Sequence, residues 1–68
     1  MVSVLGCIKR VNDWEFVSIH SEYDLLDFLD IIRIEKPKEY LIVNKDNTSI
    51  LTVNQAKHEL RKGAIDAQ

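Results

Sequence analysis

The chain has 68 residues, of which 46% are hydrophobic and 29% charged, and its formal net charge at pH 7 is −2. This length leaves too little interior for two cores, so residues 1–68 should form one small domain, and the ordinary composition argues against a disordered or fibrous chain. The single cysteine excludes an internal disulfide, and no apolar stretch approaches the ~18 residues of a membrane span. Because the N-terminus also lacks the features of a secretion signal, we expect a cytoplasmic protein that does not enter a membrane.

The first part of the chain has the pattern of a β-hairpin. Residues 2–11 are rich in β-branched side chains, Asn12 and Asp13 provide a turn signal, and residues 14–19 again have a strand-like composition. We therefore predict two antiparallel strands joined at the Asn-Asp pair.

A helix should follow this hairpin. Ser21 is a suitable N-cap with Asp24 three residues later, and the apolar residues then recur at helical spacing at Leu25, Phe28, Leu29 and Ile32. Pro37 disfavours helical geometry at the residue before it, so the helix should end by Ile34 or Glu35.

The second part of the chain resembles the first in its order of elements. Residues 39–44 and 49–52 predict two strands joined by the turn sequence KDNT. Thr52 and Gln55 have the spacing of a capping box at the start of a second helix. Gly63 is the expected residue just past the end of that helix, and residues 63–68 should form a frayed tail.

These elements predict an α+β fold in the order ββαββα. We expect a four-stranded, mostly antiparallel sheet with both helices packed on one face.

The acidic residues of the first helix allow three interpretations: a metal site, a partner surface or a solvated helix face. Asp24, Asp27 and Asp30 lie opposite its apolar side, which favours the solvated face. No motif typical of a catalytic, cofactor or metal site is present, and Cys7 is better explained as a buried strand residue than as a nucleophile. We therefore expect neither an enzyme nor a bound cofactor.

The second helix carries a basic strip formed by Lys57, His58, Arg61 and Lys62. Cations in the last turn stabilise a helix end without any ligand, although such a strip could also bind phosphates. The stretch ILTVNQAKHEL, residues 50–60, resembles the first helix of the helix-turn-helix in excisionase-type DNA-binding proteins. That resemblance covers this stretch alone and implies no function here, so a nucleic-acid-binding regulator using this helix is the alternative hypothesis and not the favoured one.

The predicted sheet itself provides the favoured hypothesis. Two helices can cover only one of its faces, and both faces are rich in apolar groups, so the other face would expose an apolar surface. We expect Trp14, Phe16, Tyr40 and Ile42 to form that surface, although a one-residue change of register would exchange this face for Leu41, Val43 and Val17. Because so small a core usually needs further stabilisation, the sequence predicts a protein-interaction or regulatory module that acts as a homo-oligomer, most simply a dimer.

Overall fold

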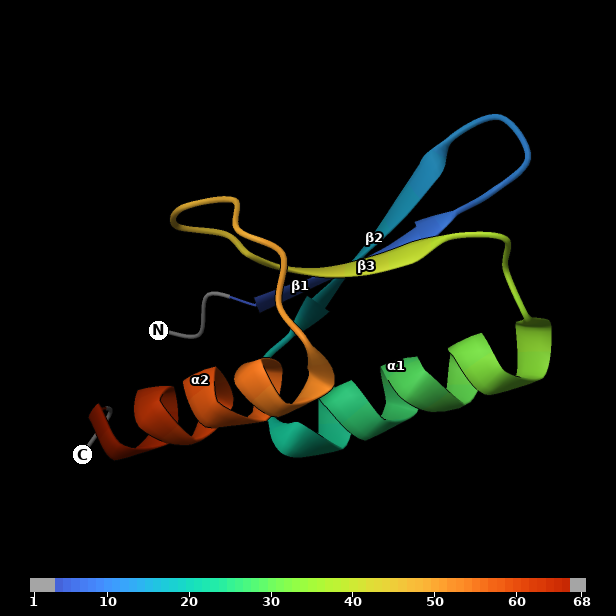
Figure 1. Ribbon diagram of the computed structural model, residues 1–68. Coiled ribbons are helices and arrows are strands. Elements are labelled where there is room, and N and C mark those ends of the chain that lie inside the picture. Colours follow the sequence, from blue (N-terminus) through green and yellow to red (C-terminus); the bar gives the residue numbers. More distant parts are fainter. Residues whose placement is uncertain (1–3, 67–68) are drawn as a thin grey trace.

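The computed structural model describes the backbone of residues 4–66 and the side chains of residues 4–62. Its elements, in chain order, are β1 (Val4–Lys9), β2 (Trp14–Ile19), α1 (Glu22–Glu35), β3 (Tyr40–Asn44) and α2 (Val53–Asp66). The three strands form one antiparallel sheet in the order β2-β1-β3, and both helices lie beneath the same face of it (Figure 1). The prediction of a small α+β fold is confirmed.

The first hairpin is present, with a first strand shorter than the predicted 2–11: β1 ends at Lys9, and residues 2 and 3 lie outside the described residues. β1 pairs with β2 from Val4 opposite Ile19 to Lys9 opposite Trp14, and the Arg10 N–H closes the loop by donating to the Asp13 carbonyl at 2.7 Å. The Asp13 carboxylate then accepts from the Trp14 N–H at 2.8 Å. The turn residues thus satisfy backbone groups at the point where the chain reverses.

β1 is the central strand, and alternate residues of it point toward the helices. Val4 and Ile8 are each 1% exposed and belong to the core. Gly6 lies between them because the ring of Phe28 packs directly on the strand: a Cβ at residue 6 would lie 2.5 Å from Cε1 of that ring, closer than packed carbon atoms approach. The rest of the core cluster comes from β2, β3 and both helices: Ile19, Leu25, Phe28, Ile42, Ala56 and Leu60.

α1 begins and ends where the sequence predicts. Ser21 is its N-cap and accepts from the Asp24 N–H at 3.2 Å. The helix ends at Glu35, and Lys36 adopts a left-handed conformation with φ 50°, from which its N–H donates to the Ile32 carbonyl at 2.9 Å. This cap satisfies a carbonyl that the last turn would otherwise leave free.

The predicted fourth strand is not confirmed, so the order of elements is ββαβα. Only Ile50 forms an isolated bridge, with Val43, and the segment makes two hydrogen bonds to β3 around it, from the Asn44 N–H to the Ser49 carbonyl at 2.9 Å and from the Leu51 N–H to the Ile42 carbonyl at 2.7 Å. Thr52 must already serve as the cap of α2, which ends the pairing before a full strand can form.

α2 begins with the predicted capping box and is longer than predicted. The Gln55 N–H donates to the Thr52 hydroxyl at 3.1 Å, and the Thr52 N–H donates to the Gln55 side-chain oxygen at 2.8 Å. The helix continues through Gly63 to Asp66, so the predicted end at Gly63 is wrong. A glycine inside a helix costs only about 1 kcal/mol relative to alanine, and no proline follows it. Residues 67 and 68 of the predicted tail lie outside the described residues.

Candidate interaction surface

The face of the sheet that points away from both helices forms the main candidate site. Cross-strand partners share a face, so the pairings of Cys7 with both Phe16 and Leu41 place these three side chains together, opposite the helix-facing Gly6. The same register gives the whole set, which we call the open face: Leu5, Cys7, Lys9, Trp14, Phe16, Ser18, Leu41 and Val43.

The open face is apolar and only partly accessible at its centre. Cys7 is 6% exposed although it points away from the helices, because it lies on the central strand between Phe16 and Leu41. Burial raises the pKa of the Cys7 thiol, which keeps it protonated and poorly nucleophilic at neutral pH. Phe16, on the outer strand, is 63% exposed. The exposure of the apolar side chains therefore increases from the central strand toward β2.

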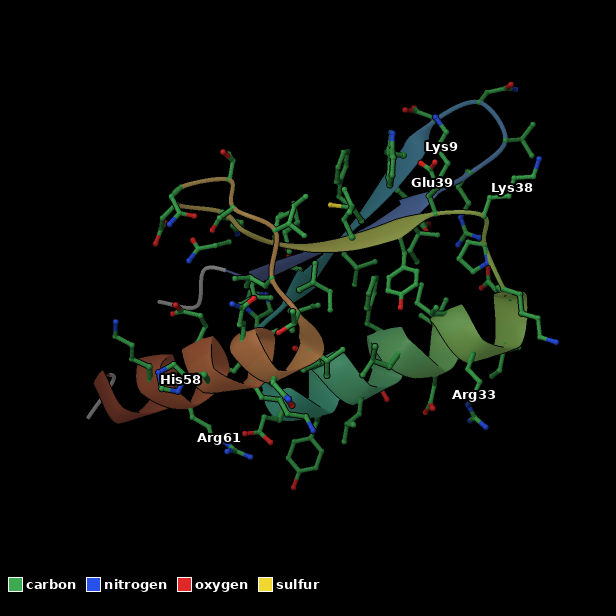
Figure 2. The ribbon with its side chains drawn as sticks, in the orientation of Figure 1. Lys9, Arg33, Lys38, Glu39, His58 and Arg61 are labelled. Carbon is green, nitrogen blue, oxygen red and sulfur yellow. The ribbon has the colours of Figure 1, made fainter. Side chains whose placement is uncertain are left out.

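At one end of the open face, charged side chains lie beside an aromatic ring. The Lys9 ammonium lies 5.3 Å from the centre of the Trp14 ring, a distance at which a cation is attracted to the ring face. Lys38 and Glu39 lie at the same end of the sheet as Lys9 (Figure 2). Lys9 is the one charged residue among those of the open face. Its N–H donates to the Glu39 carbonyl, so Glu39 lies opposite it just before β3 begins, and the charges at this face are confined to one end.

The structure separates the four residues that the sequence groups together. Trp14 and Phe16 lie on the open face, whereas Tyr40 and Ile42 point toward the helices, with Ile42 3% exposed. The Tyr40 ring meets the Phe28 ring edge-on with centroids 6.3 Å apart. The grouping of all four on one surface is therefore corrected: the pairing of Tyr40 with Ile8 sets the phase of β3, and Leu41 and Val43 take the two positions on the open face.

The basic strip on α2 is partly used within the fold. The Arg61 guanidinium pairs with the Glu22 carboxylate at 2.6 Å and ties α2 to the first turn of α1. Lys57 is half-buried, whereas His58 and Lys62 are exposed; Figure 2 shows His58 and Arg61 on the outside of α2. Glu59 interrupts the strip in sequence, so the helix does not present an uninterrupted run of cations.

The acidic residues of α1 differ from one another in their surroundings. The Asp24 carboxylate accepts from the His20 N–H at 2.9 Å and so helps to start the helix. Asp30 forms an exposed pair with Arg33 at 3.2 Å, and Asp27 is exposed. Among residues 4–62, no group of three or more His, Cys, Asp or Glu side chains is arranged to hold a metal ion.

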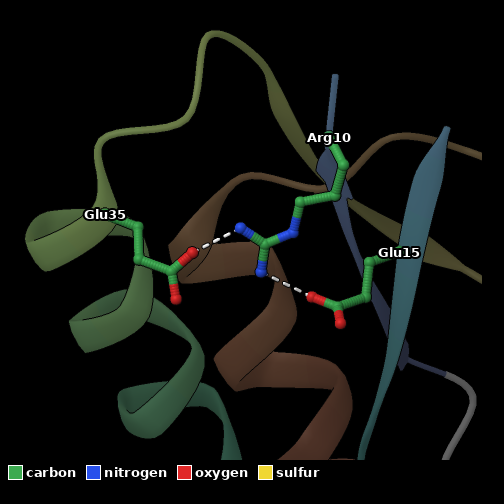
Figure 3. A network of polar contacts seen from close by, with 3 residues as sticks. All are labelled: Arg10, Glu15 and Glu35. Carbon is green, nitrogen blue, oxygen red and sulfur yellow. Dashed lines mark hydrogen bonds and ion pairs between the residues drawn. The ribbon is translucent and has the colours of Figure 1, made fainter. Parts of the chain in front are cut away.

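A polar contact that the sequence analysis missed joins the first hairpin to α1. Figure 3 shows the Arg10 guanidinium between Glu15 on β2 and Glu35 at the end of α1. Arg10 bonds the Glu15 carboxylate at 2.6 Å and the Glu35 carboxylate through its other terminal nitrogen. The hydrogen bond to Glu35, followed by that to Glu15, raises the pKa of Arg10 above its already high ordinary value. Arg10 and Glu15 lie on either side of the hairpin turn, whereas Glu35 is 25 residues from Arg10, and no motif marks the three residues.

Comparison with known proteins adds no family to this description: no family model, curated protein or solved structure matches the chain. Neither helix, over the range that the structure describes, is long and apolar enough to cross a membrane.

Proposed function

We propose that the protein is a small cytoplasmic interaction module that self-associates through the open face of its sheet. The observation that carries this proposal is the position of Phe16, which is 63% exposed on a face that neither helix covers. A two-layer domain of one sheet and one layer of helices leaves such a face without a partner layer.

A second copy is the occupant that the chemistry of this face favours. In a two-fold dimer each copy presents the same patch to the other, and a patch with the single charge of Lys9, already placed beside Trp14, meets its own copy with little repulsion. Two such sheets can pack face to face about 10 Å apart with strand directions within about 30°. The result is a four-layer arrangement with helices on both outer sides.

The size of the open face predicts a weak dimer. Three strands of five or six residues cover roughly 20 Å by 15 Å, or about 300 Å² in projection, whereas a standard interface buries about 800 Å² of accessible surface on each partner. We therefore expect a weak dimer that dissociates on dilution.

The test is a concentration series by light scattering or sedimentation equilibrium. The apparent mass should rise from the 7.9 kDa of the monomer toward twice that value. Phe16→Lys should hold the protein at monomer mass, because it places a charge within the dimer contact, at the most exposed apolar side chain of the open face. Tyr23→Lys is the matched control, since Tyr23 is an equally large exposed aromatic, 81% accessible, on α1. A wild-type chain that stays monomeric at millimolar concentration, or a Phe16→Lys variant that still dimerises, would defeat the proposal.

A further inference from the structure

The outer edge of β2 differs from the outer edge of β3 in the state of its backbone groups. In an antiparallel ladder, alternate residues of a strand bond to one neighbour and the residues between them bond to the other side. The Arg10 to Asp13 bond places the β1–β2 bonds at Val4, Gly6 and Ile8. Their partners on β2 are Ile19, Val17 and Glu15. The remaining residues of β2 therefore direct their backbone N–H and C=O groups away from β1, at the outer edge of the sheet: Trp14, Phe16 and Ser18.

The outer edge of β3 is occupied by the chain itself from Ile42 to Asn44. The Ile42 carbonyl and the Asn44 N–H, which point outward on that strand, are bonded to Leu51 and Ser49. Of the two outer edges, that of β3 is therefore partly paired by the chain itself.

On β2, local carboxylates cap only the two ends of the edge. The Trp14 N–H donates to Asp13 and the His20 N–H donates to Asp24. Between these ends, the N–H and C=O groups of Phe16 and Ser18 have no bonding partner within the described residues. β2 also carries no proline and no lysine, the residues that commonly protect a strand edge from pairing.

The surroundings of this open edge are acidic. α1 packs beneath β2, and the contacts of Asp24 with His20 and of Glu35 with Arg10 show which flank of the helix lies on the β2 side. Residues three or four positions apart lie on the same side of a helix. Asp27 is three residues after Asp24, and Ile31 is four residues before Glu35, so both fall on this flank. The carboxylates near the edge are Asp13, Glu15, Asp24, Asp27 and Glu35. Two cations lie among them by contact: Arg10, which pairs with Glu15 and Glu35, and Lys9, whose ammonium lies over the Trp14 ring. The carboxylates therefore still outnumber the cations.

We propose that the outer edge of β2 binds an extended, basic segment of a partner protein as an added strand. The backbone groups of Phe16 and Ser18 supply the hydrogen bonds, as in other cases of strand addition, and the surrounding carboxylates select lysine or arginine. Successive side chains of a bound strand point to opposite faces of the sheet. The residues of the partner segment that lie beside Phe16 are therefore apolar, and those that lie on the helix side, beside Glu15, are basic.

A second copy of β2 is disfavoured as the occupant. Its strand contains Glu15 as its only charged residue, and pairing two β2 edges would bring the acidic flanks of two α1 helices together. The binding of a basic segment is separate from the dimer on the open face and goes beyond it, because it uses backbone groups at the edge of the sheet.

The probe for this site is a hexapeptide of alternating lysine and valine, blocked at both ends. In ¹⁵N-labelled protein at low salt, the peptide should slow the hydrogen exchange of the Phe16 and Ser18 amides. A peptide with glutamate in place of lysine should not. Asp27→Asn should weaken binding of the lysine peptide about threefold, since one exposed charge is lost.

Ser18→Pro is the sharpest variant, because proline removes an N–H that points away from β1 and leaves the β1–β2 ladder intact. It should weaken peptide binding at least about tenfold, whereas the matched control Ser18→Thr should bind as the wild type does. Exchange protection that falls elsewhere, or equal binding by the proline and threonine variants, would overturn the proposal. So would protection of the Phe16 and Ser18 amides in the peptide-free protein that increases with protein concentration, because a second copy would then occupy the edge.

Discussion

The two faces of the sheet carry similar side chains but have different surroundings. On the face toward the helices, Val4, Ile8 and Ile42 are at most 3% exposed, and Gly6 lets the Phe28 ring approach the backbone. On the open face, Leu5, Leu41 and Val43 are only half-buried. Hydrophobicity alone does not decide which face becomes the core; the positions of the two helices do. The open face is therefore the surface whose apolar groups remain available to a partner.

The largest expected effect is a difference in stability between alanine variants of the two phenylalanines, one on each face of the sheet. Phe28→Ala should lower the free energy of unfolding by about 3–5 kcal/mol, because it removes a fully buried ring from the centre of the core. Phe16→Ala should cost less than about 1 kcal/mol in the monomer, since its ring is mostly exposed. Urea unfolding at a concentration below that of dimerisation measures both. Similar losses for the two variants would mean that the two faces do not differ as described.

A second prediction concerns the close approach at the centre of the covered face. Gly6→Ala should destabilise the protein by about 1–3 kcal/mol through overpacking, because the new Cβ would overlap the Phe28 ring. Combining it with Phe28→Leu, which shortens that side chain, should cost less than the sum of the two single changes. Additive losses in thermal unfolding would show that the ring does not restrict residue 6.

A third prediction concerns the attachment of α2, one of the helices that cover this face. Thr52→Ala should cost about 1 kcal/mol, because it leaves the Gln55 N–H without its partner. Thr52→Ser, which keeps the hydroxyl, is the control and should unfold close to the wild type. A Thr52→Ala variant with an unchanged melting temperature would contradict the capping box.

The smallest expected effect is on the solvated side of α1. Replacing Asp27 and Asp30 together by asparagine should change the stability by no more than about 0.5 kcal/mol, as is usual for exposed positions. Asp24→Asn should cost more than either single change, since the Asp24 carboxylate bonds the His20 N–H. Calcium binding with micromolar affinity that the double variant abolishes would instead show a metal site.

Features set by neighbouring residues were predictable from the sequence, and features set by distant pairing were not. The caps at Ser21 and Thr52, the turn at Asn12 and Asp13, and the end of α1 before Pro37 all follow from residues within a few positions of one another. The fourth strand fails because the start of α2 at Thr52 competes with pairing to β3. α2 continues past Gly63 because a glycine within a helix carries only a small propensity cost.

Only two of the four residues that the sequence assigns to one surface lie on the open face. The sequence identifies Trp14 and Phe16 correctly as sharing one face, but the phase of β3 depends on which of its residues pairs with Ile8 on the central strand. An apolar run such as YLIVN has no alternation that could reveal this phase. The open edge of β2 and the contact of Arg10 with Glu35 depend on long-range pairings too, so no local pattern indicates them.

The most direct test of the account is an isotope-filtered NOE experiment on an equimolar mixture of labelled and unlabelled protein at millimolar concentration. Self-association through the open face predicts intermolecular NOEs from the Phe16 ring to the methyl groups of Leu5, Leu41 and Val43, which should disappear in Phe16→Lys. Intermolecular NOEs confined to the helices, or none at a concentration where light scattering shows a dimer, would contradict it.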